Sequence, residues 1–272
     1  MPVHSHHRVR AAIVAALACT TVAFALPAVA QAATKTVTVR VEGENDTLLP
    51  ETEVTIGDGT AAAQKWDSSG ALPNGCANDT ASQAIELATE GDWDRDLYIQ
   101  EILGETQGYT PGNWTIYDGT HYADWGACDL HLADGTRLLV QAGETDSSPN
   151  YRPYSPILEW DGVPSAPVNT GTPFTLSLTK WIVPNTADTP DPLFPPNTHW
   201  LSPAMTQSDA VGYTVSDGTH SQTTNGSGNA TFTISTPGTY TFKAQLTGTR
   251  AGNWARSLPV DVCVEDPLSP TC

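Results

Sequence analysis

The sequence predicts a mainly β fold of the α+β class, in which one helix accompanies many short strands. Three observations predict it. Short runs in which apolar and polar residues alternate recur along the chain, and a period of two is typical of half-buried strands. Only Ala81–Ala88 places its apolar residues at helical spacing. Segments rich in Gly, Ser, Asn and Pro separate these runs, as expected of turns.

The chain after the leader begins with two alternating runs, Thr36–Val41 and Glu53–Ile56, which we predict to form a hairpin. Gly57–Asp79 has no sustained period and is rich in small residues, so we predict a loop that Cys76 holds at its end. Thr80 is the predicted N-cap of the helix, because its hydroxyl can accept a bond from an unpaired backbone N–H.

Gly91 is predicted to end the helix, since glycine adopts the left-handed conformation common at helix ends. Three more strands are predicted at Leu97–Leu103, Trp114–Tyr117 and Thr136–Gln141. Two strands, a helix and three strands follow the order of a β-grasp, in which a mixed sheet wraps one helix. We therefore expect a β-grasp-like domain at residues 33–144.

The second half of the chain has no helical signal after a polar, proline-broken linker at residues 145–156. Short alternating runs follow at the spacing of a β-sandwich, which predicts an immunoglobulin-like domain at residues 157–266 and a short tail at 267–272. The runs are Thr172–Leu178, Val211–Val215, Ala230–Ile234, Thr239–Ala244 and Leu258–Val264.

Asp-Gly-Thr occurs four times, beginning at Asp58, Asp118, Asp134 and Asp217. Asp-Gly is a favoured pair in tight hairpin turns, where both central residues take positive φ. We therefore predict turns at these positions rather than a duplicated site.

The N-terminus predicts export. Basic residues precede an uncharged stretch from Ala11 to Val29, and Ala28-Val29-Ala30 is typical of a signal-peptidase site. We therefore expect residues 1–32 to be a cleaved signal peptide. A retained membrane anchor and a lipoprotein attached through Cys19 are the alternatives. The mature protein is expected to be extracellular, either released or associated with the cell surface.

Cleavage leaves four cysteines, which allow three disulfide pairings. Thiols oxidise outside the cytoplasm, so disulfides are expected. We predict Cys76–Cys128 and Cys263–Cys272, because each pair then lies within one predicted domain.

The chain is acidic, with a formal net charge of −18. Residues 31–148 hold 21 acidic and 5 basic side chains, so the first domain carries most of the excess. Nucleic acid and anionic lipid bind basic surfaces, and we expect neither as a partner.

Several motifs of the first domain resemble a known family. They are Val37-Thr-Val-Arg-Val-Glu-Gly43, Ile99-x-x-Ile102-x-Gly104, Gly112-Asn-Trp114-x-x-Tyr117-x-Asp-Gly119 and Leu132-Ala-Asp-Gly-Thr-Arg-Leu-Leu-Val140, with Cys128 between the last two. Residues 35–142 resemble the transcobalamin-C-terminal-like domain of unknown function, within the soluble-ligand-binding β-grasp group. The resemblance implies a ligand- or partner-binding module rather than an enzyme. Pro237-Gly-Thr-Tyr240-Thr-Phe242 resembles the closing strands of bacterial immunoglobulin-like modules.

One segment of the sequence partly matches a metal-binding motif. Asp92, Asp94 and Asp96 begin like a calcium loop, but Leu97 and Leu103 stand where glycine and glutamate are required. A candidate calcium site and a solvated acidic turn are both open for this segment. Nucleophile and zinc motifs are absent from the sequence, so we expect no enzyme activity and no cofactor.

Aromatic residues are the predicted binding residues. Four aromatic rings and one histidine cluster around the Asp118 turn, and rings with a polar tip suit stacking on sugars or filling a partner's pocket. Packing in the β-grasp core is the alternative for Trp114 and Tyr117. The candidate set is Trp114, Tyr117, His121, Tyr122, Trp125 and, in the proline-rich loop from Pro184 to Pro203, Trp200.

These observations predict a secreted, non-catalytic binding module for a small ligand, a glycan or a protein, with the second domain as a spacer. A structural or adhesive surface component is the first alternative, and a secreted hydrolase is the second. A concave pocket lined by the hairpin aromatics would favour ligand capture, whereas a flat exposed strip would favour protein contact.

Overall fold

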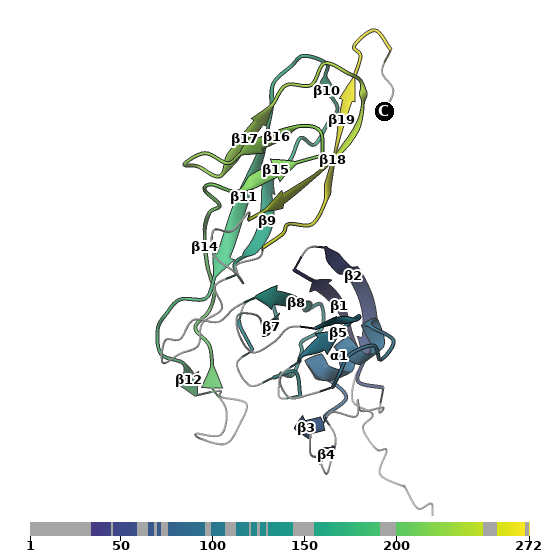
Figure 1. Ribbon diagram of the computed structural model, residues 1–272, viewed down its shortest axis with the longest axis vertical. Helices are drawn as coiled ribbons and strands as arrows, with labels where there is room; N and C mark the ends of the chain where they lie inside the picture. Colours follow the sequence, from purple (N-terminus) through teal and green to yellow (C-terminus); the bar gives the residue numbers. More distant parts are fainter. Residues whose placement is uncertain are drawn as a thin grey trace, which may run out of the picture. The chain divides into compact units, whose positions relative to one another are not determined.

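The computed structural model describes residues 34–272 except 45, 59–64, 68–69, 72–75, 96–98, 107–112, 120, 124–125, 129, 144–154, 191–199, 247–254 and 270–271. The described residues form strands β1 to β19 and one helix, α1, so the mainly β prediction is confirmed (Figure 1). The signal peptide lies outside the described residues, and its cleavage stays a prediction. Among the described helical residues, none belongs to a helix long and apolar enough to span a bilayer.

The first sheet has the strand order β2-β1-β8-β7 and is built from residues 35–143 (Figure 1). Strand β1 (Lys35–Glu42) pairs antiparallel with β2 (Thr47–Ile56) and parallel with β8 (Arg137–Gly143). Strand β7 (Asn113–Tyr117) pairs antiparallel with β8. A parallel central pair flanked by antiparallel strands, with the helix between β2 and β7 in the chain, is the predicted β-grasp topology.

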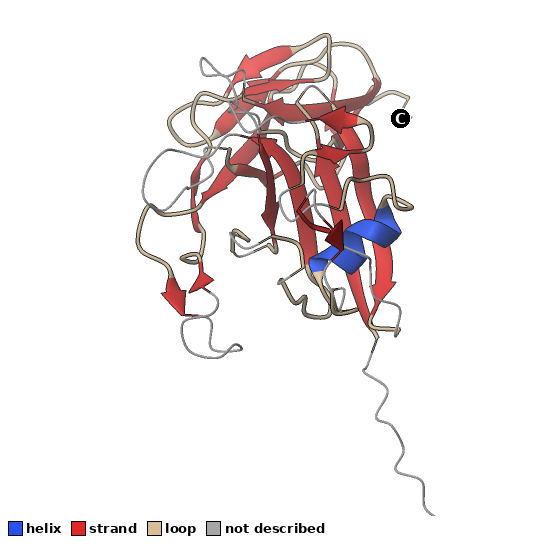
Figure 2. Cartoon of the chain, turned by 60° about the horizontal axis from the view of Figure 1, so that its bottom comes forward, coloured by secondary structure: helices blue, strands red, loops and turns tan. Residues whose placement is uncertain are grey.

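One face of this sheet packs against helix α1 (Ala81–Ala88), which Figure 2 shows beside the strands. Alternate residues of the strands point to this face, so Val37, Val39 and Val41 lie in one core with the helix. Trp114 and Ile116 of β7 belong to the same cluster, as does Ile85 of the helix. These residues are almost fully buried and form the first hydrophobic core.

Helix α1 begins and ends as predicted, but its caps differ. Thr80 occupies the N-cap position without a side-chain capping bond, because its hydroxyl donates to the Ala77 carbonyl at 2.8 Å instead. Thr80 is thus the N-cap residue as predicted, but it caps the helix without a side-chain bond. At the other end the Gly91 N–H bonds the Glu86 carbonyl at 2.9 Å, and Glu90 adopts the left-handed conformation with φ of 54°. This is a Schellman arrangement in which a non-glycine residue makes the turn.

Short elements occupy the connections of the first region. Within the predicted loop 57–79 lie β3 (Lys65–Asp67) and β4 (Gly70–Ala71), and β5 (Glu101–Ile102) pairs with β6 (Glu105–Thr106). Among the described residues of the predicted strand Leu97–Leu103, only Glu101 and Ile102 form a strand.

Both predicted disulfides are present. Cys76 is joined to Cys128 and Cys263 to Cys272, with sequence separations of 52 and 9 residues. On the chain-entropy estimate the longer loop contributes about 4 kcal/mol and the shorter about 2.6 kcal/mol.

The second region forms two packed sheets. One contains β9 (Ile157–Gly162), β11 (Phe174–Ile182), β14 (Thr206–Asp209) and β17 (Asn229–Phe232). The other has the order β10-β19-β18-β15-β16, from β10 (Val168–Asn169), β15 (Thr214–Ser216), β16 (Ser221–Thr223), β18 (Gly238–Gln245) and β19 (Val260–Glu265). A separate pair joins β12 (Thr189–Pro190) to β13 (Trp200–Leu201).

The inner faces of both sheets meet in a second core that contains Leu176, Phe232 and Phe242. Strand β9 pairs with β11 in one sheet, while the next strand, β10, pairs parallel with β19 in the other. Such a first segment shared between two mainly antiparallel sheets, with hairpins closing each sheet, is the predicted immunoglobulin-like sandwich.

Two of the Asp-Gly-Thr repeats close hairpin turns. The Asp118 N–H bonds the His121 carbonyl and the Asp217 N–H bonds the His220 carbonyl. The predicted turn is present, but among the described residues of these two turns positive φ occurs at Gly119 and Gly218 and not at the aspartates. Each aspartate instead precedes the two central residues, and its carboxylate accepts the histidine N–H at 2.7 Å or 2.5 Å.

Residues 32–272 form one compact unit, and the strand pairing divides at the predicted linker. A third apolar cluster draws on both regions and includes Tyr117, Leu139, Val183 and Met205. The existence of two independently folding domains stays a prediction.

Candidate ligand-binding cavity

The second face of the first sheet carries the polar residues of its alternating strands. Val39 and Leu138 point toward the helix, so their neighbours Thr38, Arg40 and Arg137 point away from it. In the paired register Thr38 lies opposite Arg137, and Arg40 lies opposite Leu139. This face is therefore a mixed surface of hydroxyl, guanidinium and aliphatic groups.

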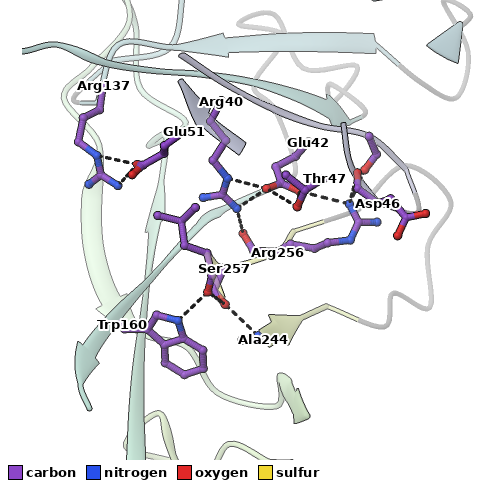
Figure 3. Close-up of polar contacts among 12 residues, drawn as sticks. Arg40, Glu42, Asp46, Thr47, Glu51, Arg137, Trp160, Ala244, Arg256 and Ser257 are labelled. Carbon is purple, nitrogen blue, oxygen red and sulfur yellow. Dashed lines mark hydrogen bonds and ion pairs between the residues drawn. The ribbon is translucent and has the colours of Figure 1, made fainter. Parts of the chain in front are cut away.

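A charged cluster covers one end of this face (Figure 3). The Arg40 Nε donates to Glu42 Oε1 at 2.5 Å, and Thr47 Oγ1 donates to the same carboxylate at 3.0 Å. Arg256 lies 3.6 Å from the other oxygen of Glu42 and also donates to the backbone carbonyls of Gly43 and Glu44. The Glu42 side chain is only 1 % exposed, so two arginines neutralise a carboxylate that water does not reach.

A second row of charges borders the cavity. Arg137 donates from Nε and Nη2 to Glu51 Oε1 at 3.0 Å and 2.5 Å, and from Nη1 to Glu159 Oε1 at 3.3 Å. Hydrogen bonding to Glu51 raises the pKa of Arg137 above its ordinary value, so the guanidinium stays charged. The other oxygen of Glu159 accepts the indole N–H of Trp181 at 2.8 Å. We call Glu51, Arg137 and Glu159 the polar row.

These side chains enclose a cavity of about 550 Å³. Its walls come from β1, β2, β8, β9 and β11, together with the turns at Gly119 and Gly135 and a residue preceding β19. A volume of this size falls within the range of small-molecule sites. The polar and aromatic lining residues include Thr38, the three residues of the polar row, Trp160 and Trp181.

A hydrogen bond and packing within the protein hold Trp160 in place. Its indole N–H donates to the Leu258 carbonyl at 2.8 Å, and its ring packs beside the second core. The adjacent Ser257 hydroxyl accepts the Ala244 N–H at 2.9 Å, as Figure 3 shows. Each of the two tryptophans thus has its polar edge bonded within the protein.

Two of the aromatic residues predicted to bind, Trp114 and Tyr117, lie in hydrophobic cores. Trp114 is 7 % exposed within the first core, and its indole N–H has no partner among the described residues. Tyr117 is fully buried and donates to the Ser155 carbonyl at 3.0 Å, and burial raises the pKa of its hydroxyl. Tyr122 is half-buried, with its ring centroid 6.0 Å from that of Tyr117. His121 is half-buried 3.8 Å from Asp118.

The other predicted site residues are Trp125, Trp200 and the three aspartates of the candidate calcium site. Trp125 and Asp96 lie outside the described residues, and Trp200 is described only as part of the backbone of β13. Asp92 is exposed, whereas Asp94 accepts the N–H groups of Gln100 and Glu101 at 2.7 Å and 3.1 Å. Among the described residues, no group of three or more His, Cys, Asp and Glu side chains is arranged to hold a metal ion.

The structure therefore brings together a set of residues other than the predicted hairpin aromatics. One signal for it exists in the sequence: Arg40 interrupts the Thr-Val-Thr-Val run at a position where its side chain shares a face with Thr38. Trp160 stands between Glu159 and Asp161, and Trp181 follows Lys180, and neither segment carries a motif. Their proximity to Arg137 depends on how the two regions pack.

Comparison with protein-family models, curated proteins and solved structures finds no match to this chain. The resemblance of residues 35–142 to the transcobalamin-C-terminal-like domain therefore remains an expectation from the motifs. The cavity and its lining are accordingly interpreted from their own chemistry.

Proposed function

We propose that this protein is an exported, non-catalytic binding protein that captures its ligand in the cavity bordered by the polar row and the two tryptophans. One observation carries the proposal: a concave space of about 550 Å³ is lined by preformed hydrogen-bonding groups and aromatic rings. Largely apolar concavities with a few convergent polar groups are the usual form of small-molecule sites.

Export is supported by the signal-peptide pattern and by the two disulfides. Disulfides persist mainly in oxidising compartments. The acidic surface of the first region agrees with a protein that meets neither nucleic acid nor anionic lipid.

A binding role is supported by the state of the cavity's charged groups. The carboxylates of Glu51 and Glu159 are hydrogen-bonded to Arg137, and a carboxylate held in this way is a poor base or nucleophile. The family resemblance of the first domain also implies capture of a ligand rather than its conversion.

The proposal is tested by a thermal-shift screen of the mature protein, residues 33–272, against neutral and charged oligosaccharides, amino acids, short peptides and cobalamin. A ligand that binds only the folded state raises its stability by about 2.7 kcal/mol at a hundredfold excess over Kd. We expect a hit whose shift disappears in Thr38→Trp, because the indole would fill the cavity.

Thr36→Trp is the matched control, since Thr36 lies two residues earlier on the same face of β1 and does not line the cavity. A ligand that binds Thr38→Trp as tightly as the native protein would place the site elsewhere. A screen with no cavity-dependent hit would favour the structural or adhesive role.

A further inference from the structure

We propose that the cavity takes an uncharged saccharide. This inference rests on the proposed function, because it assigns a ligand class to the same cavity. It follows from three features of the lining: charged groups that already have partners, the donors and acceptors of the polar row, and the bonded indole edges.

The charged side chains that line the cavity already have partners within the protein. Arg40 is paired with Glu42, and Arg137 with Glu51 and Glu159. Asp118 accepts the backbone N–H of His121 at 2.7 Å. An ionic ligand would compete with these partners for the same charges, and displacing one would leave it unpaired, which costs free energy. An uncharged ligand leaves the pairs intact.

The polar row presents both kinds of hydrogen-bonding group. A guanidinium has five N–H donors and each carboxylate has about four acceptor sites, so the pairing leaves capacity on all three side chains. The side chains of Arg137 and Glu159 are 55 % and 41 % exposed, so this capacity is accessible to a ligand. Each sugar hydroxyl can both donate and accept a hydrogen bond. Neighbouring hydroxyls can therefore donate to the carboxylates of the polar row and accept from its guanidinium.

The two tryptophans supply the apolar part of the site. Trp181 donates its indole N–H to Glu159, and Trp160 donates its own to Leu258. Because both donors are used, the indole surface that lines the cavity is carbon. Sugar rings carry C–H groups on their faces, and these pack against aromatic carbon while the hydroxyls at the ring edge reach polar groups.

Charged ligands fit this lining less well. The lining side chains comprise three acids and two arginines, so the cavity has a small net negative charge that disfavours anions. A cation would bind best at a carboxylate without a donor. Glu51 and Glu159 both accept from Arg137, and Asp118 accepts the His121 N–H.

The test uses the mature protein on an array of immobilised neutral oligosaccharides, with sialylated and sulfated glycans as charged comparisons. The strongest neutral oligosaccharide is then titrated by calorimetry into the native protein and two variants. We expect Glu51→Ala to weaken binding about tenfold or more, since a charge-assisted hydrogen bond is lost. Glu53→Ala should change Kd by less than about twofold, because Glu53 is exposed on the same strand outside the cavity.

Trp181 provides a second pair of variants. Trp181→Phe keeps an aromatic face and should retain most of the affinity, whereas Trp181→Leu should lose about tenfold. If the leucine variant does not fold, the glutamate pair and the phenylalanine variant still decide the question.

Each remaining result is decisive. Selective binding of charged glycans, or a non-saccharide ligand whose affinity falls in Glu51→Ala, would overturn the saccharide assignment and leave the cavity as the binding site. If the native protein and Glu51→Ala bind every ligand equally, both the assignment and the proposed function fail.

Discussion

Glu42 illustrates how single residues of this protein carry the contacts between its two regions. Its carboxylate is 1 % exposed and lies between Arg40, on its own strand, and Arg256, which is far away in the sequence. Arg40 also donates to the Arg256 carbonyl at 3.0 Å. Burying these charges costs desolvation free energy, which their mutual attraction and hydrogen bonds offset.

We predict that Glu42→Gln lowers the free energy of unfolding by about 3–5 kcal/mol, because Arg40 and Arg256, whose side chains are 8 % and 10 % exposed, would lose their countercharge. Urea unfolding of the disulfide-bonded protein followed by circular dichroism measures this loss. Glu53→Gln removes one charge from an exposed site on the neighbouring strand and should have an effect within about 0.5 kcal/mol. Equal stability of both variants would show that the cluster is energetically neutral.

Helix α1 is tied to the turn that follows it by a single carboxylate. Glu86 accepts the indole N–H of Trp93 at 2.7 Å and two N–H groups of Arg95 at 2.8 Å. Hydrogen bonding to Arg95 lowers the pKa of Glu86 below its ordinary value of 4.5, although burial opposes this shift. The bonds hold Arg95 in the left-handed conformation, with φ of 59°.

The lowered pKa of Glu86 predicts a pH-dependent contribution to stability. The ionised carboxylate is favoured in the folded state, so its contribution is complete above 4.5 and is lost as the pH falls through the lower folded pKa. The stability difference between the native protein and Glu86→Gln should therefore be constant near neutral pH and shrink in acid. Unfolding midpoints of both proteins across this range provide the measurement.

Glu90→Gln is the control for Glu86→Gln, because it removes an exposed charge at the end of the same helix. The stability advantage of the native protein over Glu86→Gln should be larger at neutral pH than its advantage over Glu90→Gln. A difference between native and Glu86→Gln proteins that stays constant into acid would contradict the assignment.

At the scale of the whole molecule, two β regions with separate cores are joined by a shared apolar cluster and by the Glu42 cluster. The cavity lies among the same contacts, since its lining comes from both regions. Interfaces between regions of one chain are smaller and more polar than cores, so this junction is the expected weak point of the fold.

We predict that limited proteolysis cuts within residues 145–156 and that the two fragments stay associated under native conditions. The linker is polar and proline-rich, which favours cleavage, while the shared clusters hold the fragments together. Size-exclusion chromatography of the cleaved protein should give one peak containing both fragments. In cleaved Glu42→Gln protein the fragments should separate.

Fragments that separate from the native sequence without denaturant would show that the junction contributes little. A protein that resists cleavage across the linker would contradict the prediction of two folding domains.

Much of the fold was predictable because it follows from local periodicity. The alternation in Thr36–Val41, the helical spacing in Ala81–Ala88 and the runs of the second region all correspond to observed elements. The strands that were missed are β3, β4, β6, β9, β10, β12, β13, β14 and β16. Most of these strands are very short, and Thr206–Asp209 is polar and exposed, so backbone pairing with Lys180 and its neighbours defines that strand instead of an apolar pattern.

The candidate site was not predictable to the same degree. Aromatic density around Asp118 pointed to the hairpin, where Trp114 and Tyr117 proved to be core residues. An alternating pattern predicts which residues share one face of a strand. It does not predict which of the two faces a second region covers. The sequence pattern alone would place Arg40 and Glu42 on the surface. They are buried because the second region covers their face of the sheet.

The sequence by itself determined the class of fold, the disulfide partners and the acidity of the first region, because these depend on composition, periodicity and cysteine positions. Tertiary structure alone decided the cavity. Glu51, Arg137, Glu159 and Trp181 come from four strands in two regions, and their hydrogen bonds span up to 86 residues of chain. Contacts between residues so far apart arise from packing of whole sheets, which local patterns do not encode.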